Sequence, residues 1–192
     1  MGNGAEKERL QADFSKYTLG DYDPGRNFFV RAMWFLTNAI FIRGYWNPSS
    51  GLRRFLLKLY GAKIGKGVVI KPGVNIKFPW YLEVGDQTWI GENVWIDNLV
   101  PVRIGSNCCL SQGSMLLTGN HNYKLTHFPA FFGEIILEDG AWVGAKAMVA
   151  PGVTLKSHSV LSIMSVATHD LEPYTIYSGH PAQAIRKREI EA

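Results

Sequence analysis

The residues best suited to proton transfer are the histidines, and one of the five lies at a break in an otherwise regular sequence. His121 stands near the start of GNHNYKLTHFPAFFGE, residues 119–134, a stretch that begins polar, ends aromatic and contains Pro129 and Gly133. An imidazole titrates near neutral pH, so it can take the proton of an attacking hydroxyl. The alternative is a solvated loop histidine. His121 is therefore the first candidate for a general base.

The elements that must position His121 follow a six-residue repeat. Aliphatic residues recur every six positions, with short slips between series, and a small or β-branched residue follows most of them four positions later. A period of six fits neither an amphipathic helix nor a strand of simple alternation. It is typical of a prism with three short strands per coil. The aliphatic anchors are Ile64, Ile70, Ile76, Leu82, Val84, Ile90, Ile96, Val102, Ile104, Leu110, Leu116, Leu137, Val143, Val149, Leu155 and Leu161.

The repeat predicts an all-β fold, a left-handed parallel β-helix of about five coils over residues 63–168. Glycines that directly follow many anchors are expected to relieve positive φ at the corners. Residues 119–134 are expected to leave the helix as a loop, and loops on rigid scaffolds often carry function. Residues 169–192 lose the period and are expected to form a C-terminal extension, with a short helix or strand from about Ala182.

Residues 1–62 are expected to form a partly helical region that caps the first coil. Apolar residues have helical spacing over 28–43 and again over 52–59. The apolar run 28–42 is too short, and too interrupted by polar residues, to span a bilayer.

Charge is unevenly distributed, because residues 26–60 carry six basic residues and no acid although the chain's net charge is only +4. In one interpretation these cations simply face water on a structural cap. In the other, the face also docks on the anionic cytoplasmic membrane surface. No nucleic-acid-binding motif accompanies the stretch, so nucleic acid is not expected as a partner. The side chains expected to make a membrane contact are Trp34, Phe35, Trp46, Arg53 and Arg54.

The N-terminal sequence and the two cysteines indicate a cytoplasmic protein. The N-terminal sequence MGNGAEKERL lacks the apolar core of a signal peptide. The adjacent Cys108 and Cys109 cannot easily bridge each other, so they are expected to be small core or corner residues in a reducing compartment.

Four segments resemble the hexapeptide-repeat acyltransferases, the superfamily of galactoside, maltose, xenobiotic and serine acetyltransferases. They are IGENVWIDN, TGNHNY, AWVGAKAMVAPGVTL and YSGHPAQAIRK, so the resemblance covers about residues 64–186. The third segment is the most specific, because the superfamily carries a similar W-[IV]-G-x-x-x-x-[IV]-x-P-G-V string. With NPSSGLRRFLLKLYGAKIG before them, the likeness is greatest to the sugar O-acetyltransferases of colanic-acid-type polysaccharide biosynthesis.

The resemblance implies transfer of an acetyl group from acetyl-coenzyme A to a hydroxyl or amine of a sugar or related small acceptor, without a metal. It also implies a homotrimer with the cofactor in the groove between neighbouring prisms. His121 is the implied general base. The second ring nitrogen of such a base must be held, and the alignment leaves Asp97 and Asn98 as candidates, with a plain corner role equally open. Asn120 and Asn122 could serve instead.

For the cofactor, the resemblance implies a strand edge after the loop. A backbone amide of Gly144 or Ala145 would bind the oxyanion of the tetrahedral intermediate. Trp142 is expected to face outward, in the cofactor groove or at the subunit interface. The chain departs from its relatives at SIMS, residues 162–165, where G-A-G-S is usual, and after Thr168, where a lysine is usual. The implied cofactor-binding set is Trp142, Gly144, Ala145, Ile163, Thr168, His169 and Arg186, with Lys187 as an alternative to Arg186.

Two other functions use the same fold. A non-catalytic β-helix scaffold would leave His121 without a role. A γ-class carbonic anhydrase needs three histidines around zinc. No histidine precedes His121, and His121 and His127 are six positions apart in one proline-containing loop, so two ligand positions are unaccounted for.

Overall fold

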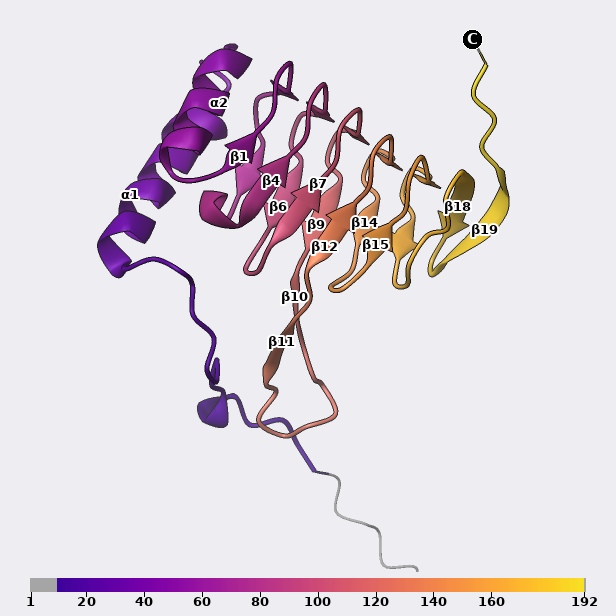
Figure 1. The fold of residues 1–192 in the computed structure, drawn as a ribbon. Helices are drawn as coiled ribbons and strands as arrows, with labels where there is room; N and C mark the ends of the chain where they lie inside the picture. Colours follow the sequence, from indigo (N-terminus) through magenta and orange to yellow (C-terminus); the bar gives the residue numbers. More distant parts are fainter. Residues whose placement is uncertain (1–9, 192) are drawn as a thin grey trace, which may run out of the picture.

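The computed structural model describes residues 10–191, and most of them form a parallel β-solenoid (Figure 1). Its strands are short, mostly two or three residues, as the six-residue period requires. In chain order they are β1 (Lys63–Ile64), β2 (Val69–Ile70), β3 (Asn75–Ile76), β4 (Leu82–Val84), β5 (Trp89–Ile90), β6 (Trp95–Asp97), β7 (Val102–Ile104), β8 (Cys109–Leu110), β9 (Met115–Leu117), β10 (Gly119–His121), β11 (Ala130–Phe132), β12 (Ile135–Leu137), β13 (Trp142–Val143), β14 (Met148–Val149), β15 (Thr154–Leu155), β16 (Val160–Leu161), β17 (Val166–Ala167), β18 (Thr175–Gly179) and β19 (Ala182–Lys187).

Three parallel sheets form the sides of the prism. The first sheet is ordered β1-β4-β7-β12-β15 and the third is ordered β3-β6-β9-β14-β17. The second runs β2-β5-β8-β13-β16-β18, with β19 added at its end. The residues described therefore include five complete coils and part of a sixth. We call the corner between the first and second sheets the first edge, that between the second and third sheets the second edge, and that between the third and first sheets the third edge.

The core confirms the six-residue repeat, because every predicted anchor is buried. Parallel pairing places each anchor on the equivalent anchor of the next coil, as in Ile70, Ile90 and Leu110. The small residues four positions after the anchors are buried too, including Thr88 and Ser114 at the corners. Stacking therefore turns a repeat in sequence into continuous aliphatic columns.

The corner glycines have a different role from the expected one. Gly85 and Gly144, which directly follow anchors, do not have positive φ. A Cβ on Gly144 would instead lie 2.5 Å from the backbone nitrogen of Ile163 in the next coil. Positive φ occurs two residues after such a glycine, as at Gln87 (φ 56°). The glycines directly after anchors thus permit close stacking of coils, whereas the positive φ two residues later is taken by a glycine at Gly67 (φ 65°) and by a non-glycine residue at Gln87.

The N-terminal helices cover the first coil, as predicted (Figure 1). Helix α1 (Phe28–Thr37) begins after Asn27, whose side chain accepts a hydrogen bond from the Val30 amide, and continues as the π-helix η2 (Asn38–Ile42). Helix α2 (Ser50–Leu59) begins after Ser49, which accepts in the same way from Leu52. Two short 3-10 helices, η1 (Phe14–Lys16) and η3 (Pro79–Tyr81), complete the elements. None of the helices in residues 10–191 is long and apolar enough to cross a membrane.

Two side chains that we expected at the surface are buried. Trp34 is 1% exposed, and its indole N–H donates to the Ile76 carbonyl of the first coil. Arg53 is fully buried and donates to the carbonyls of Ile42, Gly44 and Asn47. Trp34 thus attaches the cap to the solenoid, Arg53 joins α2 to the segment around the end of η2 within the cap, and neither can reach a membrane.

The solenoid also continues past residue 168, where we expected it to end. Leu171 bridges Leu155 in parallel, and β18 pairs in parallel with β16. The period is lost because Tyr177 pairs with Leu161, sixteen positions earlier, whereas Leu161 pairs with Val143, eighteen positions earlier. Strand β19 then turns back antiparallel on β18, which covers the last edge of the second sheet.

Candidate active site

The predicted loop is a β-hairpin that projects from the third edge (Figure 1). Strands β10 and β11 pair antiparallel, with His121 opposite Ala130. The hairpin leaves the prism between β9 of the third sheet and β12 of the first. His121 thus lies at the outer end of a two-stranded arm that a rigid coil supports.

His121 is held by Phe128, a residue that the sequence did not single out. The two rings stack with centroids 4.5 Å apart and planes at 11°, and His121 Nδ1 lies 3.2 Å from the Phe128 carbonyl oxygen. A carbonyl oxygen can only accept, so in the neutral ring Nδ1 carries the proton and Nε2 has a free lone pair. Phe128 has φ 48°, in the left-handed region that functional loops often contain. This arrangement suits a general base that acts through Nε2.

An N-terminal strap, residues 10–25, packs along the hairpin. The Asp13 amide donates to the Thr126 carbonyl, and the ring of Phe14 meets Phe128 edge to face at 5.2 Å. The ring of Tyr17 lies 5.6 Å from that of His121. The imidazole therefore lies between an aromatic residue of its own hairpin and one from the strap.

Tyr22 attaches the strap to the base of the hairpin. Its ring stacks on Phe132 at 4.5 Å, and its hydroxyl donates to the Leu99 carbonyl. Burial, chiefly, raises the pKa of this hydroxyl above its usual range, so Tyr22 remains a neutral donor. Sequence analysis missed the strap because its aromatic residues follow no period and contact residues about a hundred positions away.

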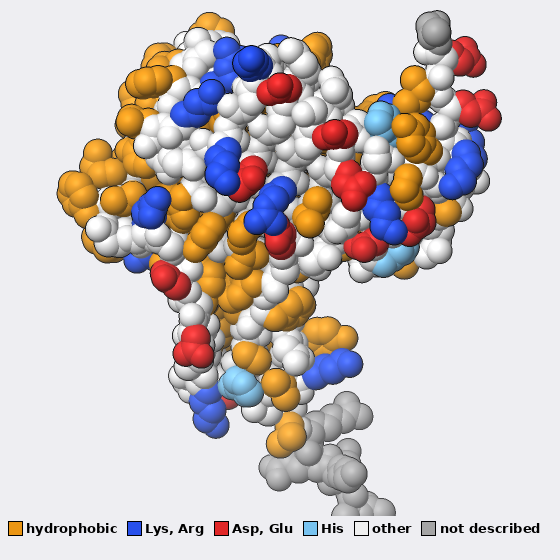
Figure 2. Space-filling view, in the orientation of Figure 1, with side chains coloured by type: hydrophobic (Ala, Val, Ile, Leu, Met, Phe, Trp, Pro, Cys, Tyr) orange, Lys and Arg blue, Asp and Glu red, His pale blue; other side chains and the backbone are white. Residues whose placement is uncertain are grey.

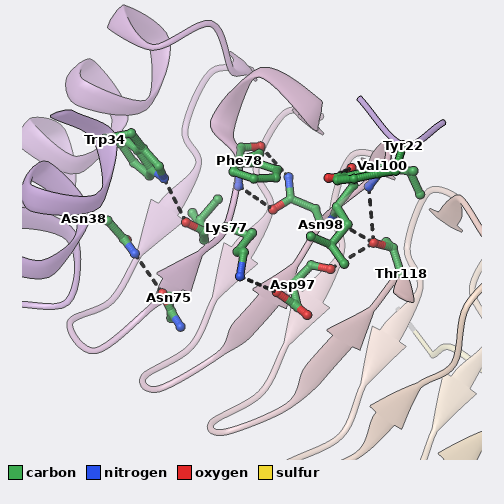
Figure 3. Close-up of polar contacts among 12 residues, drawn as sticks. Tyr22, Trp34, Asn38, Asn75, Lys77, Phe78, Asp97, Asn98, Val100 and Thr118 are labelled. Atoms are coloured by element: carbon green, nitrogen blue, oxygen red, sulfur yellow. Dashed lines mark hydrogen bonds and ion pairs between the residues drawn. The ribbon is translucent and has the colours of Figure 1, made fainter. Parts of the chain in front are cut away.

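Asp97 and Asn98 lie on the third edge, in the coil before the hairpin, and their side chains contact residues of the prism instead of His121. Figure 3 shows these contacts. Asn98 is fully buried, and its amide both accepts from the Phe78 N–H and donates to the Phe78 carbonyl. It therefore has the corner role that we left open. The Asp97 carboxylate lies 3.9 Å from Lys77 Nζ, and its backbone carbonyl accepts from the Thr118 hydroxyl. The contact to His121 Nδ1 is made by the Phe128 carbonyl.

The two loop asparagines shape the backbone rather than the imidazole. The side-chain oxygen of Asn120 accepts from the His121 amide at 2.8 Å, and that of Asn122 accepts from the Lys124 amide at 3.1 Å. A shallow pocket opens beside the ring, lined among others by Asn120, His121, Tyr123 and Phe131.

Most of the expected cofactor residues lie elsewhere on the prism. Gly144, Ala145 and Ile163 form turns that stack on one another at the second edge, where Met164 N–H donates to the Ala145 carbonyl. Trp142 faces outward on the second sheet, 43% exposed, and its indole donates to Ser111. Of these, Ile163 is the most accessible, at 66% exposed.

The two candidate oxyanion donors, the N–H groups of Gly144 and Ala145, differ in whether they already form a hydrogen bond. The Gly144 N–H already donates to the Leu161 carbonyl at 2.7 Å, as part of the stacking of coils. The Ala145 N–H makes no hydrogen bond to any residue of the described range 10–191. Ala145 is therefore the candidate that retains a free donor.

Thr168 and His169 follow β17 and lie on the third edge, the edge of the hairpin. Arg186 lies on β19 at the end of the second sheet, exposed and opposite Ile176. Within one chain, the expected site residues therefore lie on two different edges. His121 is on the third edge and Ala145 is on the second, and the third sheet lies between them. As for metals, residues 10–191 contain no cluster of three His, Cys, Asp or Glu side chains that could hold an ion.

Comparison with known proteins identifies the chain's relatives. No protein-family model matches it. It is 35% identical, over 178 residues, to the colanic acid biosynthesis acetyltransferase WcaF of Escherichia coli K12, a match that covers 92% of this chain and 97% of that protein. The galactoside O-acetyltransferase of the same organism is 25% identical over 70% of this chain and 68% of that protein.

Solved structures have the same fold. A hexapeptide-repeat acetyltransferase of Vibrio cholerae, complexed with acetyl-coenzyme A, aligns with a TM-score of 0.76 at 22% identity, over 84% of this chain and 88% of that one. A galactoside acetyltransferase in complex with coenzyme A aligns with a TM-score of 0.74 at 23% identity, over 84% and 82%. The chain has a repeating solenoid and a projecting hairpin that carries a histidine, and it matches WcaF over nearly the whole length of both proteins. It is therefore a member of the hexapeptide-repeat acetyltransferase family to which WcaF belongs.

Proposed function

We propose that this acetyltransferase moves the acetyl group of acetyl-coenzyme A to a hydroxyl, or an amine, of a sugar, with His121 as the general base. The observation that carries the proposal is the hydrogen bond from His121 Nδ1 to the Phe128 carbonyl, because it leaves Nε2 free to accept a proton. The family membership supports the donor and the acceptor class, since relatives are named as an acetyltransferase of colanic acid biosynthesis and a galactoside O-acetyltransferase, and fold neighbours are complexed with acetyl-coenzyme A or coenzyme A.

The chemistry is a direct transfer. Nε2 of His121 takes the acceptor's proton while its oxygen attacks the thioester carbonyl. The tetrahedral intermediate carries a negative oxygen, which the Ala145 amide is placed to stabilise. The new C–O bond remains, the C–S bond breaks, and His121 returns its proton to the departing thiolate. The products are the acetyl ester and coenzyme A.

The proposed site needs two chains. His121 is on the third edge and Ala145 on the second, so both can meet one substrate only if the second edge of a neighbour faces the hairpin. A cyclic homotrimer provides such a contact three times with the same interface. Trp142, exposed on the adjoining second sheet, would then lie in the groove or at the interface.

The pocket beside His121 suits a sugar. Tyr123 is 78% exposed and Phe131 is 47% exposed, so both offer aromatic surface to the C–H face of a sugar ring. The Asn120 amide lies in the same pocket and can bind hydroxyl groups.

The decisive test is a thiol-release assay with acetyl-coenzyme A and a panel of sugars and nucleotide sugars. The wild-type protein is expected to release thiol with some of these acceptors, and His121→Ala is expected to lower kcat by about 10²-fold or more. His127→Ala is the matched control, because His127 is exposed on the same hairpin. Near-normal turnover of His121→Ala would overturn the assignment of the base. A wild-type protein that binds no acetyl-coenzyme A would favour the scaffold instead.

A further inference from the structure

Helix α1 presents an entirely apolar face to solvent. Among residues 28–40, every residue that is exposed is apolar. A helix that only caps a core would place polar residues on this side. The exposed residues are Phe28, Phe29, Met33, Phe35, Leu36, Ala39 and Ile40, and the large ones are between 41% and 77% exposed.

The polar residues of α1 and η2 instead face the solenoid. Asn38 is buried and its amide donates to Asn75 of the first coil (Figure 3). Arg31 also lines a pocket between the helix and the third sheet, and its Nε is buried without a hydrogen-bond partner among residues 10–191. The inner side also carries the buried Trp34 and Ile42, so the two helices are apolar on both sides. An outer face without exposed polar residues indicates that it has an apolar neighbour in its working state.

The loop after η2 and helix α2 enlarge this apolar surface. The indole of Trp46 is 64% exposed and donates to the Ile40 carbonyl, so it lies beside the end of η2. On α2, Phe55 is 62% exposed and Leu59 is 67% exposed. Figure 2 shows hydrophobic side chains gathered at this end of the molecule, with Lys and Arg side chains beside them. We call the exposed apolar residues of α1 and η2, with Trp46, Phe55 and Leu59, the cap face.

The segment that forms the cap face and the first coil carries charge of a single sign. From residue 24 to residue 82 the sequence contains no Asp or Glu, but it contains ten of the twenty Lys and Arg residues: Arg26, Arg31, Arg43, Arg53, Arg54, Lys58, Lys63, Lys66, Lys71 and Lys77. Arg26, Arg43 and Lys58 are exposed and form no ion pair with any described residue.

Three cations meet at the border of the cap face. Arg31, Arg43 and Lys77 line one pocket, and Phe35 and Ala39 of the cap face line its rim. Lys77 lies 3.9 Å from Asp97, whereas Arg31 and Arg43 form no ion pair with any described residue. The pocket therefore offers two uncompensated guanidinium groups next to exposed aromatic surface, which is a suitable environment for a phosphate that is attached to an apolar chain.

We propose that the cap face is a membrane-docking surface, which lies in the interface of an anionic bilayer with Arg31 and Arg43 on lipid phosphates. Aromatic and aliphatic side chains on a helix parallel to the membrane, with cations beside them, are typical of such peripheral contacts. Helix α1 and η2 together span fifteen residues, or about 22 Å, too short for a transmembrane helix.

A second copy of the chain fits the surface less well. A two-fold contact through the cap face would place like cations opposite one another, because no acid between residues 24 and 82 could compensate them. An anionic bilayer offers both the apolar phase and the opposite charge.

The test is co-sedimentation of the full chain with vesicles of phosphatidylcholine alone or mixed with phosphatidylglycerol. Binding is expected only to the anionic vesicles, and it should weaken as salt rises. Arg43→Glu should weaken it by roughly five-fold or more, since one cation near an anionic surface contributes about 1 kcal/mol. Lys124→Glu, an exposed lysine on the distant hairpin, is the matched control and should bind as the wild type does.

The apolar contribution is tested by Phe29→Ser combined with Phe35→Ser. Both rings are more than two-thirds exposed, so the fold should tolerate the change, and vesicle binding should fall by roughly ten-fold or more. Ile190→Ser is the control, because Ile190 is 58% exposed at the opposite end of the solenoid. Circular dichroism of each variant verifies folding.

Three results would overturn the proposal. One is the absence of wild-type binding to anionic vesicles at low salt. Another is self-association that Phe29→Ser with Phe35→Ser abolishes while no vesicle binding occurs, which would assign the surface to a second copy. The last is complete release from vesicles by millimolar inorganic phosphate at constant ionic strength, which would assign the Arg31 and Arg43 pocket to a free anion. Acetyl transfer to a soluble acceptor tests the proposed reaction separately.

Discussion

The imidazole of His121 lies flat on the ring of Phe128 while its Nδ1 contacts the carbonyl of that same residue. One residue thus fixes both the plane of the ring and the tautomer. The carbonyl can do so because Phe128 has a positive φ, which turns the backbone back toward β10. The relationship is local to the hairpin, so His121 is oriented before any substrate or second chain arrives.

This arrangement predicts that Phe128 acts on catalysis only through His121. Phe128→Asn removes the ring but suits the left-handed backbone, so the carbonyl should stay in place. We expect kcat to fall roughly ten-fold, with little change in KM for acetyl-coenzyme A, because the base is less well positioned. Steady-state kinetics measure both parameters.

A double variant distinguishes positioning from a general structural effect. Once His121 is replaced by Ala, adding Phe128→Asn should lower kcat no further, because the two residues act as a unit. Additive losses would show that the role of Phe128 does not pass through His121.

The separation of His121 and Ala145 on different edges predicts complementation between chains. His121→Ala and Ile163→Glu should each be nearly inactive, the second because it places a charge in the proposed cofactor groove beside Ala145. Co-expressed in equal amounts, they should recover about a quarter of wild-type activity, since random mixing leaves both partners intact in about one site in four. Ile163 is well exposed, so its variant should still fold.

Pairs of variants on the same edge provide the control. His121→Ala co-expressed with His121→Gln should recover nothing, because no site regains the base. If His121→Ala with Ile163→Glu also recovered nothing while forming mixed oligomers, the site would lie within one chain.

The solenoid was predictable because the same short pattern of residues recurs along the sequence and can be recognised locally. Each anchor, such as Ile90, faces inward for the same reason as the next, and many repeats in phase outweigh a few exceptions. The end of the solenoid was predicted less well, because the last coil is two residues shorter and moves Tyr177 out of phase.

The environment of the candidate base was less predictable. His121 could be placed on a loop, but its contacts with Phe128 and Tyr17 depend on how the hairpin folds and on a strap more than a hundred residues earlier. No period in the sequence reports such contacts. Asn98 and Arg53 show the same limit. The residue type alone does not distinguish a polar side chain with a structural role, at a corner or in the cap, from one with a functional role.

Asp97 and Asn98 should therefore differ in how much stability an exchange of amide and carboxylate costs. Asn98→Asp removes the donor to the Phe78 carbonyl and buries a carboxylate opposite that oxygen. We expect a loss of about 3–5 kcal/mol of unfolding free energy, the cost of a buried charge without a partner. Asp97→Asn keeps the shape of a side chain at the edge and should cost less than about 1 kcal/mol.

Urea denaturation followed by circular dichroism measures both changes. Thiol release measured on the folded Asp97→Asn protein then separates stability from catalysis. Full activity in this variant would agree with the orienting role of Phe128, and a loss comparable to that of His121→Ala would return Asp97 to the candidate catalytic residues.

The last prediction concerns how the cap is held together, and it compares two basic residues of α2. Arg53 is fully buried and donates to the carbonyls of Ile42, Gly44 and Asn47, which lie at and after the end of η2 and would otherwise lack donors. Arg53→Met keeps much of the volume but leaves these oxygens unsatisfied, so we expect a loss of about 3–5 kcal/mol. Lys58→Met, at an exposed position without an ion pair, should change stability by less than about 0.5 kcal/mol. Thermal unfolding monitored by tryptophan fluorescence is suitable, because Trp34 is buried against the first coil and its emission changes when the cap separates from that coil. Equal stability of the two variants would mean that packing of Trp34 and Leu57 alone holds the helices in place, and that the three carbonyls find other donors.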